Sequence, residues 1–272
     1  MMSLISSNII LPTITVAIST IAENMGRFLN NFPFESLRDA DEVLIIIQGI
    51  LDSKPMEFSN KYTIIEDNSK GVSRSRNIGL LHANCDYIWF MDDDILLNND
   101  AIITVKNYIL KYNADIFTVR MQTFDRDAPY KNYPNKHILD RGDIINISTV
   151  EIIASRGFIL ESKVRFNESL GLGTKYPSCE ENIFLLDLFD LGAEMIHIPE
   201  YVQKHPFVNR RTMHFTDPNI LFAKGVFCKR YNGFMGIILM FLWICKSLIC
   251  GANFKDSINL VYGYKSADNI LN

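Results

Sequence analysis

The stretch GVSRSRNIGLLHANCDYIWFMDDDI, residues 71–95, decides the fold class of this chain. It opens on glycine and serine, continues with a helical pattern of apolar residues, and passes into YIWFM at 87–91, which has the composition of a buried strand. Asp92, Asp93 and Asp94 follow directly. Three adjacent carboxylates repel one another unless a positive partner lies among them, so the end of this strand predicts a binding site.

Short apolar strands alternate with helical segments upstream of this stretch. Runs rich in β-branched residues predict strands at 13–20, 41–49 and 62–68. Strands joined through helices pair in parallel, because parallel neighbours need crossover connections. The predicted fold class is α/β, with a mixed, mainly parallel, Rossmann-like sheet flanked by helices. Ligands bind such sheets at the carboxyl ends of the strands, which is where the three aspartates fall.

The composition limits the kinds of function that the chain can have. A chain of 272 residues buries a large core, so we expect one large domain, alone or with an appendage. Its 48% of hydrophobic residues is rich for a soluble protein and compatible with a segment that touches lipid. The net charge of −4 provides no basic field for nucleic acid. Five scattered cysteines without a Cys-x-x-Cys pair, and an N-terminus without a signal-peptide pattern, favour a reduced, cytoplasmic setting.

The acidic turn has the chemistry of a divalent cation site. Mg²⁺ and Mn²⁺ take carboxylate oxygens and keep open positions for water and substrate phosphates. Such an ion can bridge a diphosphate and neutralise the charge that develops as it leaves. The alternative is that Asp92 to Asp94 are loop carboxylates next to a helix capped by Asn99 or Asp100. Spacing alone leaves both interpretations open.

Three segments share the pattern of one known family. Residues 71–95 hold a glycine, a small residue, an Arg-Asn pair, a helix, and an apolar strand that ends in Asp-x-Asp. FNESLGLGTKYPSCEENIFLLDLFDLGA, residues 166–193, has an acidic pair at the head of a helix, and TVAIST is the opening strand. In order and spacing these segments, which span 13–206, resemble a family 2 glycosyltransferase with a GT-A fold, of the bacterial surface-polysaccharide type.

The resemblance implies a site for a nucleotide-diphosphate sugar and a divalent metal. Asp94 would ligate the metal, with Asp92 or Asp93 on the nucleotide ribose or sharing the ion. A late histidine, His205, would complete the metal shell. The remaining residues expected to line the nucleotide pocket are Thr20, Glu23, Gln48, Asp67 and Arg76.

Most of these residues also have a structural interpretation. Thr20 and Glu23 could simply start a helix, and Asp67 could stabilise its own turn. Arg76 could be a surface or capping arginine, and His205 an exposed loop histidine.

Gln48 is a departure from the family, which usually places an aspartate after its second strand to meet the nucleotide base. A glutamine can still donate and accept hydrogen bonds to a base edge, but the identity of the nucleotide is thereby in doubt. Arg210 and Arg211 could hold the diphosphate when a C-terminal loop closes, or could be solvated.

The acidic pair Glu180 and Glu181 supplies the candidate catalytic groups. A carboxylate facing the anomeric carbon can take the proton of an attacking hydroxyl. By the resemblance Glu181 is the base and Glu180 binds acceptor hydroxyls, although the family normally has Glu-Asp here. The structural alternative is a capping box, with Ser178 as the cap of the helix. Upstream, GFIL at 157–160 is expected to be a strand, and the glycines of GLG at 171–173 to let the backbone pass close to the sugar.

The last part of the chain changes character. GFMGIILMFLWIC, residues 233–245, is almost entirely apolar but short for a membrane-spanning helix, and Lys224, Lys229 and Arg230 precede it. Three interpretations compete: membrane-surface contact through 233–250, a helix pair with the later segment SINLVYGYKS, and a self-association face. The first is favoured here, because a lipid-linked acceptor would give it a purpose.

The sequence therefore predicts a GT-A domain at 1–215, with a nucleotide-sugar-binding half at 13–100 and an acceptor-binding half at 101–215, and a helical, membrane-associated segment at 216–272. The predicted function is inverting sugar transfer to an acceptor hydroxyl, with a lipid-linked glycan as acceptor, at the inner face of the cell membrane. A metal-dependent nucleotidyltransferase and a non-catalytic scaffold of the same shape are the alternatives.

Overall fold

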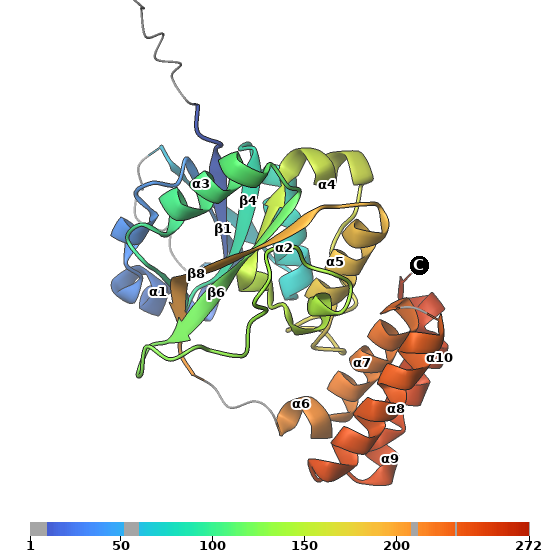
Figure 1. The fold of residues 1–272 in the computed structure, drawn as a ribbon. Coiled ribbons are helices and arrows are strands. Elements are labelled where there is room, and N and C mark those ends of the chain that lie inside the picture. The colour runs from blue at the N-terminus through green and yellow to red at the C-terminus, as the bar shows by residue number, and fades with distance from the viewer. Residues whose placement is uncertain (1–9, 52–59, 208–211, 232, 272) are drawn as a thin grey trace, which may run out of the picture.

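One sheet forms the centre of the molecule in the computed structural model, which describes residues 10–51, 60–207, 212–231 and 233–271 (Figure 1). Its eight strands are β1 (Ile14–Ile21), β2 (Glu42–Gln48), β3 (Tyr62–Asp67), β4 (Tyr87–Asp92), β5 (Leu96–Leu97), β6 (Ile116–Thr123), β7 (Ile152–Ser155) and β8 (Met195–His205). Their order across the sheet is β3-β2-β1-β4-β7-β6-β8-β5. The mixed α/β fold class expected from the sequence is confirmed.

The direction of the strands changes across the sheet. β3, β2, β1 and β4 are parallel, as the alternation of strands and helices predicted. Beyond them β7 runs antiparallel to β4 and β6, while β8 is parallel to β6. In the parallel half, Ser19 pairs with Asp92, and Gln48 pairs with both Ile21 and Asp67. The strand ends therefore meet along one edge of the sheet.

Helices cover both faces of the sheet, and each face has its own apolar core. On one face lie α1 (Met25–Asn31) and α3 (Ala101–Tyr112), and on the other lie α2 (Val72–His82), α4 (Arg156–Ser162) and α5 (Glu180–Asp190). In β1, Val16 and Ile18 face the first core and Ala17 faces the second. Burial on both faces explains why these strands are continuous apolar runs in the sequence.

The segment GFIL is helical, so the expected strand at 157–160 is wrong. It lies within α4, where the Ser155 hydroxyl accepts a hydrogen bond from the backbone N–H of Phe158. A short apolar run has no period that separates a strand from a buried helix, and the cap at Ser155 decides between them.

The C-terminal appendage is a group of helices that packs against α5 (Figure 1). Its members are α6 (Met213–Thr216), α7 (Pro218–Tyr231), α8 (Gly233–Ile249), α9 (Phe254–Ser257) and α10 (Asn259–Leu271). Ala223, Val226 and Phe227 of α7 belong to the same apolar core as α5. The appendage is therefore joined to the sheet domain through a shared core.

Helices α7 and α10 pack closely against each other in the appendage. A Cβ on Gly225 would overlap the carbonyl oxygen of Leu260, and one on Gly263 would overlap that of Phe222. The segment SINLVYGYKS thus packs mainly on α7 rather than forming a pair with 233–245, which corrects that alternative. None of the helices in the described ranges is both long and apolar enough to cross a membrane.

Candidate functional site

The edge where the parallel strands end holds most of the predicted donor-site residues. Thr20, Gln48, Asp67 and Asp92 lie at or next to the ends of β1, β2, β3 and β4. This convergence follows from the parallel register, since neighbouring strands deliver their carboxyl ends to one place.

The middle aspartate of the acidic turn, Asp93, interacts with other side chains of the protein. Asp93 accepts hydrogen bonds from the Thr20 hydroxyl at 2.6 Å and from the Asn24 amide at 3.3 Å. The guanidinium of Arg27 lies 3.8 Å from its other oxygen. Asp93 therefore anchors the loop after β1, and it is less available to a ligand than Asp92 and Asp94, the outer pair of Asp-x-Asp.

Asp94 faces His205 with a spacing that suits a cation. The Nδ1 of His205 lies 2.6 Å from the carbonyl oxygen of Pro206, which can only accept, so Nδ1 carries the hydrogen. The other ring nitrogen, Nε2, lies 3.6 Å from an oxygen of Asp94. Two electron-pair donors that face each other at this distance fit a shared cation.

Partial burial raises the pKa of Asp92, and the charge of Asp94 adds to this effect while Arg76 opposes it. Within the described ranges no three His, Cys, Asp or Glu side chains come together as a ready-made metal site. A cavity of about 440 Å³ adjoins the turn, lined by Asp93, Asp94, Arg27 and the rings of Phe28, Phe32 and Phe124 among others. A cation held by Asp94 and His205 would take its remaining ligands from substrate and water.

Arg76 links the donor edge to the acidic pair. Its guanidinium is buried, 6% exposed, and donates to an oxygen of Glu180 at 2.7 Å. A second nitrogen lies 3.8 Å from Asp92, and the group sits over the ring of Phe166. The interpretation of Arg76 as a surface arginine is therefore wrong.

Glu181 lies at the start of α5, in surroundings that raise its pKa. Burial, and next the carboxylate of Glu180, raise the pKa of Glu181 to about 8. Its Oε2 is buried and has no hydrogen-bond partner among the described residues. A carboxyl group that titrates near neutrality and has a free oxygen has the properties of a general base.

The capping box predicted for this helix is not formed. Cys179 is the N-cap residue, with left-handed backbone at φ 69°, and no side chain caps α5. The Ser178 hydroxyl instead lies 3.6 Å from the Cys179 sulfur. Glu181 is therefore not used to cap its own helix.

The glycine loop at 171–173 packs on the start of α2. The backbone N–H of Val72 donates to the carbonyl of Leu172 at 2.9 Å, and the Ser73 hydroxyl donates to that of Leu170 at 2.6 Å. Gly171 has φ +98°, and a Cβ there would meet Val72, Ser73 and Glu180. The glycines that were expected to lie close to a sugar thus join this loop to the start of α2.

The remaining predicted donor residues make contacts within the protein. The side-chain oxygen of Gln48 accepts from the N–H of Gly71 at 2.8 Å, so Gln48 positions the loop before α2. Partial burial acts to raise the pKa of Asp67, but hydrogen bonds from Arg74 and Ser69 lower it.

Glu23 is exposed and lies 3.9 Å from the ammonium of Lys70. Arg210 and Arg211 lie outside the described residues.

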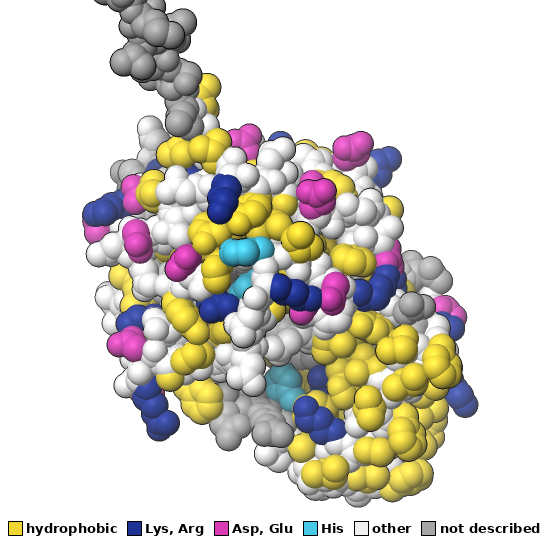
Figure 2. Space-filling view, in the orientation of Figure 1, with side chains coloured by type: hydrophobic (Ala, Val, Ile, Leu, Met, Phe, Trp, Pro, Cys, Tyr) yellow, Lys and Arg dark blue, Asp and Glu magenta, His cyan; other side chains and the backbone are white. Residues whose placement is uncertain are grey.

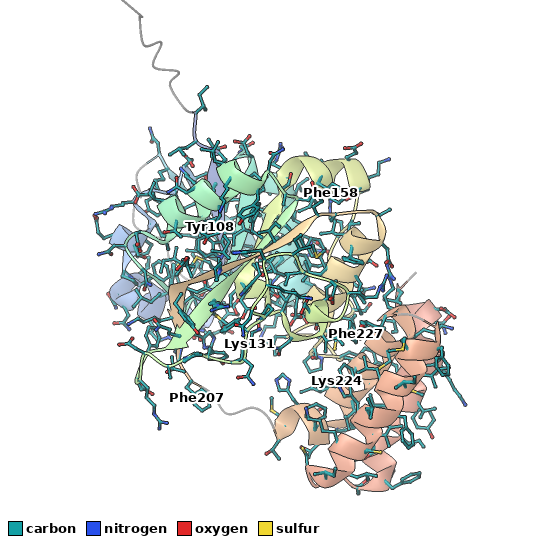
Figure 3. The ribbon with its side chains drawn as sticks, in the orientation of Figure 1. Tyr108, Lys131, Phe158, Phe207, Lys224 and Phe227 are labelled. Carbon is teal, nitrogen blue, oxygen red and sulfur yellow. The ribbon has the colours of Figure 1, made fainter. Side chains whose placement is uncertain are left out.

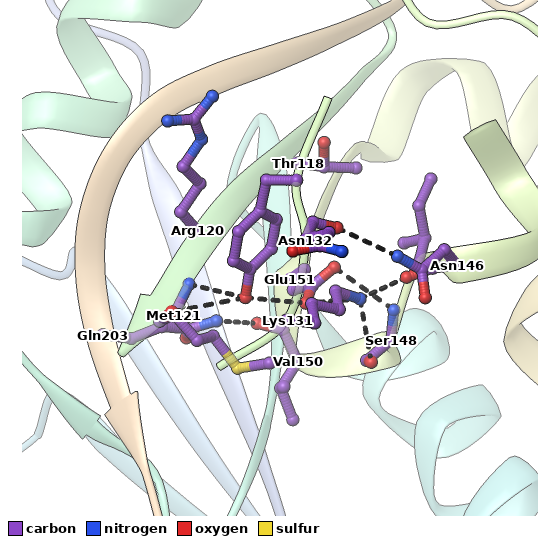
Figure 4. A network of polar contacts seen from close by, with 12 residues as sticks. Thr118, Arg120, Met121, Lys131, Asn132, Asn146, Ser148, Val150, Glu151 and Gln203 are labelled. Atoms are coloured by element: carbon purple, nitrogen blue, oxygen red, sulfur yellow. Dashed lines mark hydrogen bonds and ion pairs between the residues drawn. The ribbon is translucent and has the colours of Figure 1, made fainter. Parts of the chain in front are cut away.

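A buried polar network around Glu151 was not expected from the sequence (Figure 4). Glu151 is 2% exposed and forms an ion pair with Lys131 at 2.8 Å; its oxygens also face the Ser148 N–H and the Tyr133 hydroxyl. A cavity of about 240 Å³ opens beside it, with Lys131, Tyr133, Glu151 and His197 in its wall. Asn182, next to Glu181, donates to the carbonyls of Ile144 and Ile147, and Ile147 lines this cavity. The only sequence signal for this network is an isolated glutamate in an apolar run.

A parallel sheet half with an Asp-x-Asp pair at its edge, continued by a half with mixed strand directions, is typical of the GT-A class of transferase folds. Residues 39–167 match the family model described as glycosyl transferase family 2. These residues therefore match the family that the motifs indicated.

Similar proteins agree with this assignment. The glycosyltransferase GlyA of Streptococcus pneumoniae is 23% identical over 119 residues, which are 42% of this chain and 17% of that protein. The poly(ribitol-phosphate) beta-N-acetylglucosaminyltransferase TarS of Staphylococcus aureus is 22% identical over 163 residues, 58% of this chain and 26% of TarS. The matches thus span about a quarter or less of each relative.

Crystal structures of residues 1–349 of TarS share the fold. One of them has a TM-score of 0.63 at 14% sequence identity, and the match covers 94% of this chain and 91% of the TarS chain. The complex with UDP-GlcNAc has a TM-score of 0.63 at 13% identity and covers 94% and 92%. The GT-A fold expected from the sequence is confirmed.

Proposed function

We propose that the protein is an inverting glycosyltransferase that moves a sugar from a nucleotide-diphosphate donor to an acceptor hydroxyl. The observation that carries this proposal is that the buried guanidinium of Arg76 lies 3.8 Å from Asp92 and 2.7 Å from Glu180, and so joins the acidic turn to the acidic pair. A diphosphate bound at the aspartates and an acceptor bound at Glu181 would meet across a single buried arginine.

The donor side would bind the nucleotide at the parallel strand ends. Asp94, Asp92 and His205 would hold Mn²⁺ or Mg²⁺, which when bound neutralises charge on the leaving diphosphate. Arg76 adds a fixed positive charge beside Asp92. Since the similar TarS structures include complexes with UDP and UDP-GlcNAc, uridine nucleotides are the first donors to test.

The acceptor side would use Glu181 as the general base. Because Arg76 already neutralises Glu180, the second carboxylate is free to take a proton from the attacking hydroxyl. Direct attack from the face opposite the leaving diphosphate inverts the anomeric centre. Glu180 would then orient Arg76 and the acceptor hydroxyls.

Calorimetric titration with nucleotide diphosphates tests the donor site. We expect binding that needs Mn²⁺ or Mg²⁺ in the wild type, is lost in Asp94→Asn, and is kept in Glu181→Gln, since Glu181 serves the acceptor. Transfer to an acceptor should be lost in both variants. Absence of binding to every nucleotide by a folded protein would contradict the proposal and favour the scaffold alternative.

We also propose that α8 rests on the inner face of the cell membrane and that the acceptor is a lipid-linked glycan of a bacterial surface-polysaccharide pathway. Apolar side chains cover the appendage in Figure 2. On α8 the exposed ones are Phe234, Met235, Ile237, Ile238, Phe241, Leu242, Leu248 and Ile249. Basic residues of α7 and α8 would meet anionic headgroups beside this apolar face.

Vesicle flotation and light scattering distinguish membrane contact from self-association at the apolar face of α8. Phe241, which is 64% exposed, can be changed to aspartate without disturbing the core. We expect Phe241→Asp to reduce binding to anionic vesicles while the protein stays monomeric in both forms. A wild-type dimer that Phe241→Asp dissociates would instead identify a self-association surface.

A further inference from the structure

The cavity beside Glu151 has an exposed rim and a buried floor. Asn132 and Asn146 are exposed at its rim (Figure 4). Thr118, Glu151 and His197 are each only 2% exposed and form its floor. Its volume of about 240 Å³ is below the roughly 300–1,000 Å³ of pockets for drug-sized ligands, so it suits a single ring of a larger molecule.

The charged groups in the cavity wall are paired within the protein. Lys131, labelled in Figure 3, lies in the segment between β6 and β7, and its ammonium forms the ion pair with Glu151 at 2.8 Å. Asp143, also in the wall, pairs with Lys136 at 2.8 Å. An ionic ligand would lose its hydration here without gaining a free counter-charge, so the cavity favours an uncharged one.

The floor of the cavity holds a hydroxyl group that can donate to a ligand. The Nε–H of Arg120 donates to Nε2 of His197 at 3.1 Å, so Nδ1 of this histidine carries the hydrogen. Burial, and next the charge of Arg120, lower the pKa of His197 to about 4, which agrees with a neutral ring. Nδ1 lies 2.9 Å from the Thr118 hydroxyl oxygen and donates to it. Within the described ranges no protein group accepts the hydrogen of that hydroxyl, which is available to a ligand oxygen.

The rim adds amide groups, and apolar side chains lie between the polar ones. The Asn146 amide donates to the backbone carbonyl of Asn132 at 3.1 Å and keeps its side-chain oxygen as an acceptor. Leu139 and Ile147 supply apolar contacts in the wall. A sugar ring has hydroxyl groups at its edge and C–H groups on its faces, so it matches this combination of uncharged polar and apolar groups.

Hydrogen bonds tie the cavity wall to the first turn of α5. The side-chain amide of Asn182, which is buried, donates to the carbonyls of Ile144 and Ile147 at 2.8 and 3.1 Å. Ile147 lines the cavity, and Glu181 directly precedes Asn182. A ring bound in the cavity would therefore lie beside the turn that carries the candidate base.

We propose that this cavity binds an uncharged sugar residue of the acceptor, an inference that rests on the transferase function proposed above. The Thr118 hydroxyl donates to one sugar oxygen, and the amides of Asn132 and Asn146 bind hydroxyl groups at the rim. The described residues of the cavity wall include none of the acidic turn, where the donor diphosphate is expected. The sugar in this cavity therefore belongs to the other substrate.

Saturation-transfer NMR titrations of the full chain test the subsite. The probes are glucose, galactose and N-acetylglucosamine, with glucuronate as the charged counterpart of glucose. We expect at least one uncharged sugar to bind, and glucuronate to bind more weakly than glucose. Thr118→Val keeps the shape of the side chain and removes its hydroxyl, so it should weaken sugar binding about tenfold, the effect of one buried hydrogen bond.

Thr15→Val is the matched control. Thr15 is also buried in a strand, its hydroxyl donates to Glu42 at 2.6 Å, and it is not part of the cavity wall. This variant should bind sugars as the wild type does. A lower melting temperature of Thr118→Val with unchanged sugar binding would show a purely structural role and overturn the inference.

Asn146→Ala provides a second test that does not depend on a buried substitution. Asn146 is exposed, so the variant keeps the core intact, and it should weaken sugar binding about threefold. If Thr118→Val does not fold, Asn146→Ala decides alone. Binding of none of the three sugars to the wild type, or of glucuronate as tightly as glucose, would overturn the assignment to an uncharged sugar.

Titrations with UDP and UDP-GlcNAc in the presence of Mn²⁺ separate this inference from the proposed function. If Thr118→Val weakens the binding of UDP-GlcNAc but not of UDP, the cavity holds the donor sugar and the acceptor assignment fails. If the wild type binds UDP but no free sugar, the subsite fails and the donor site stands. If sugar binding depends on Thr118 while no nucleotide binds, the transferase function fails and the sugar site stands.

Discussion

The raised pKa of Glu181 makes the stability of the protein depend on pH in a definite direction. The unfolded chain loses this proton near 4.5, the ordinary value for glutamate, whereas the folded protein holds it until about 8. The folded state therefore binds the extra proton between these values, and stability falls as the pH rises through them. The difference corresponds to at most ~5 kcal/mol at 1.36 kcal/mol per pH unit. Because Arg76 shares the charge of the pair, we expect roughly 2–3 kcal/mol.

Glu181→Gln removes this cost, because an amide does not ionise. Its melting temperature should equal that of the wild type at about pH 5 and exceed it by roughly 5 °C at about pH 8.5. Scanning calorimetry at a series of pH values measures the difference. Glu194→Gln is the matched control, since Glu194 is exposed, and it should show no pH-dependent change. A constant difference between Glu181→Gln and the wild type across the pH range would refute the reasoning.

Three further substitutions test the contacts that hold the site. Arg76→Met leaves the buried carboxylate of Glu180 unpaired and should lower the free energy of unfolding in urea by about 3–5 kcal/mol; an effect under about 1 kcal/mol would contradict the buried pair. Gly225→Ala forces α7 away from α10 and should cost about 3 kcal/mol or more, whereas Gly233→Ala, with open space at its Cβ, should be tolerated; equal melting temperatures would show that the close approach is not needed. Asn182→Leu removes two hydrogen bonds from the wall of the polar cavity and should cost about 1–3 kcal/mol, with faster amide exchange at 144–147 as the local measurement.

The sequence alone determined the features that depend on neighbouring residues. β-branched apolar runs predicted the four parallel strands, because strands buried on both faces need no polar alternation. The order of glycine, Arg-Asn, helix, strand and Asp-x-Asp predicted the family, because each motif is local. GFIL failed because four apolar residues fit a helix and a strand equally well, and only the cap at Ser155 decided.

The tertiary structure decided how those residues are used. The sequence does not distinguish Asp92, Asp93 and Asp94 from one another, but in the structure the loop after β1 forms hydrogen bonds with the middle one. The pair of Arg76 with Glu180 joins residues 104 positions apart, a separation that no local pattern spans. In the sequence Lys224 is one of the basic residues that precede the apolar run 233–245. Only the packing of α7 against α5 shows that Lys224 is buried. Local periodicity fixes the elements, whereas burial and pairing of charges depend on which elements meet.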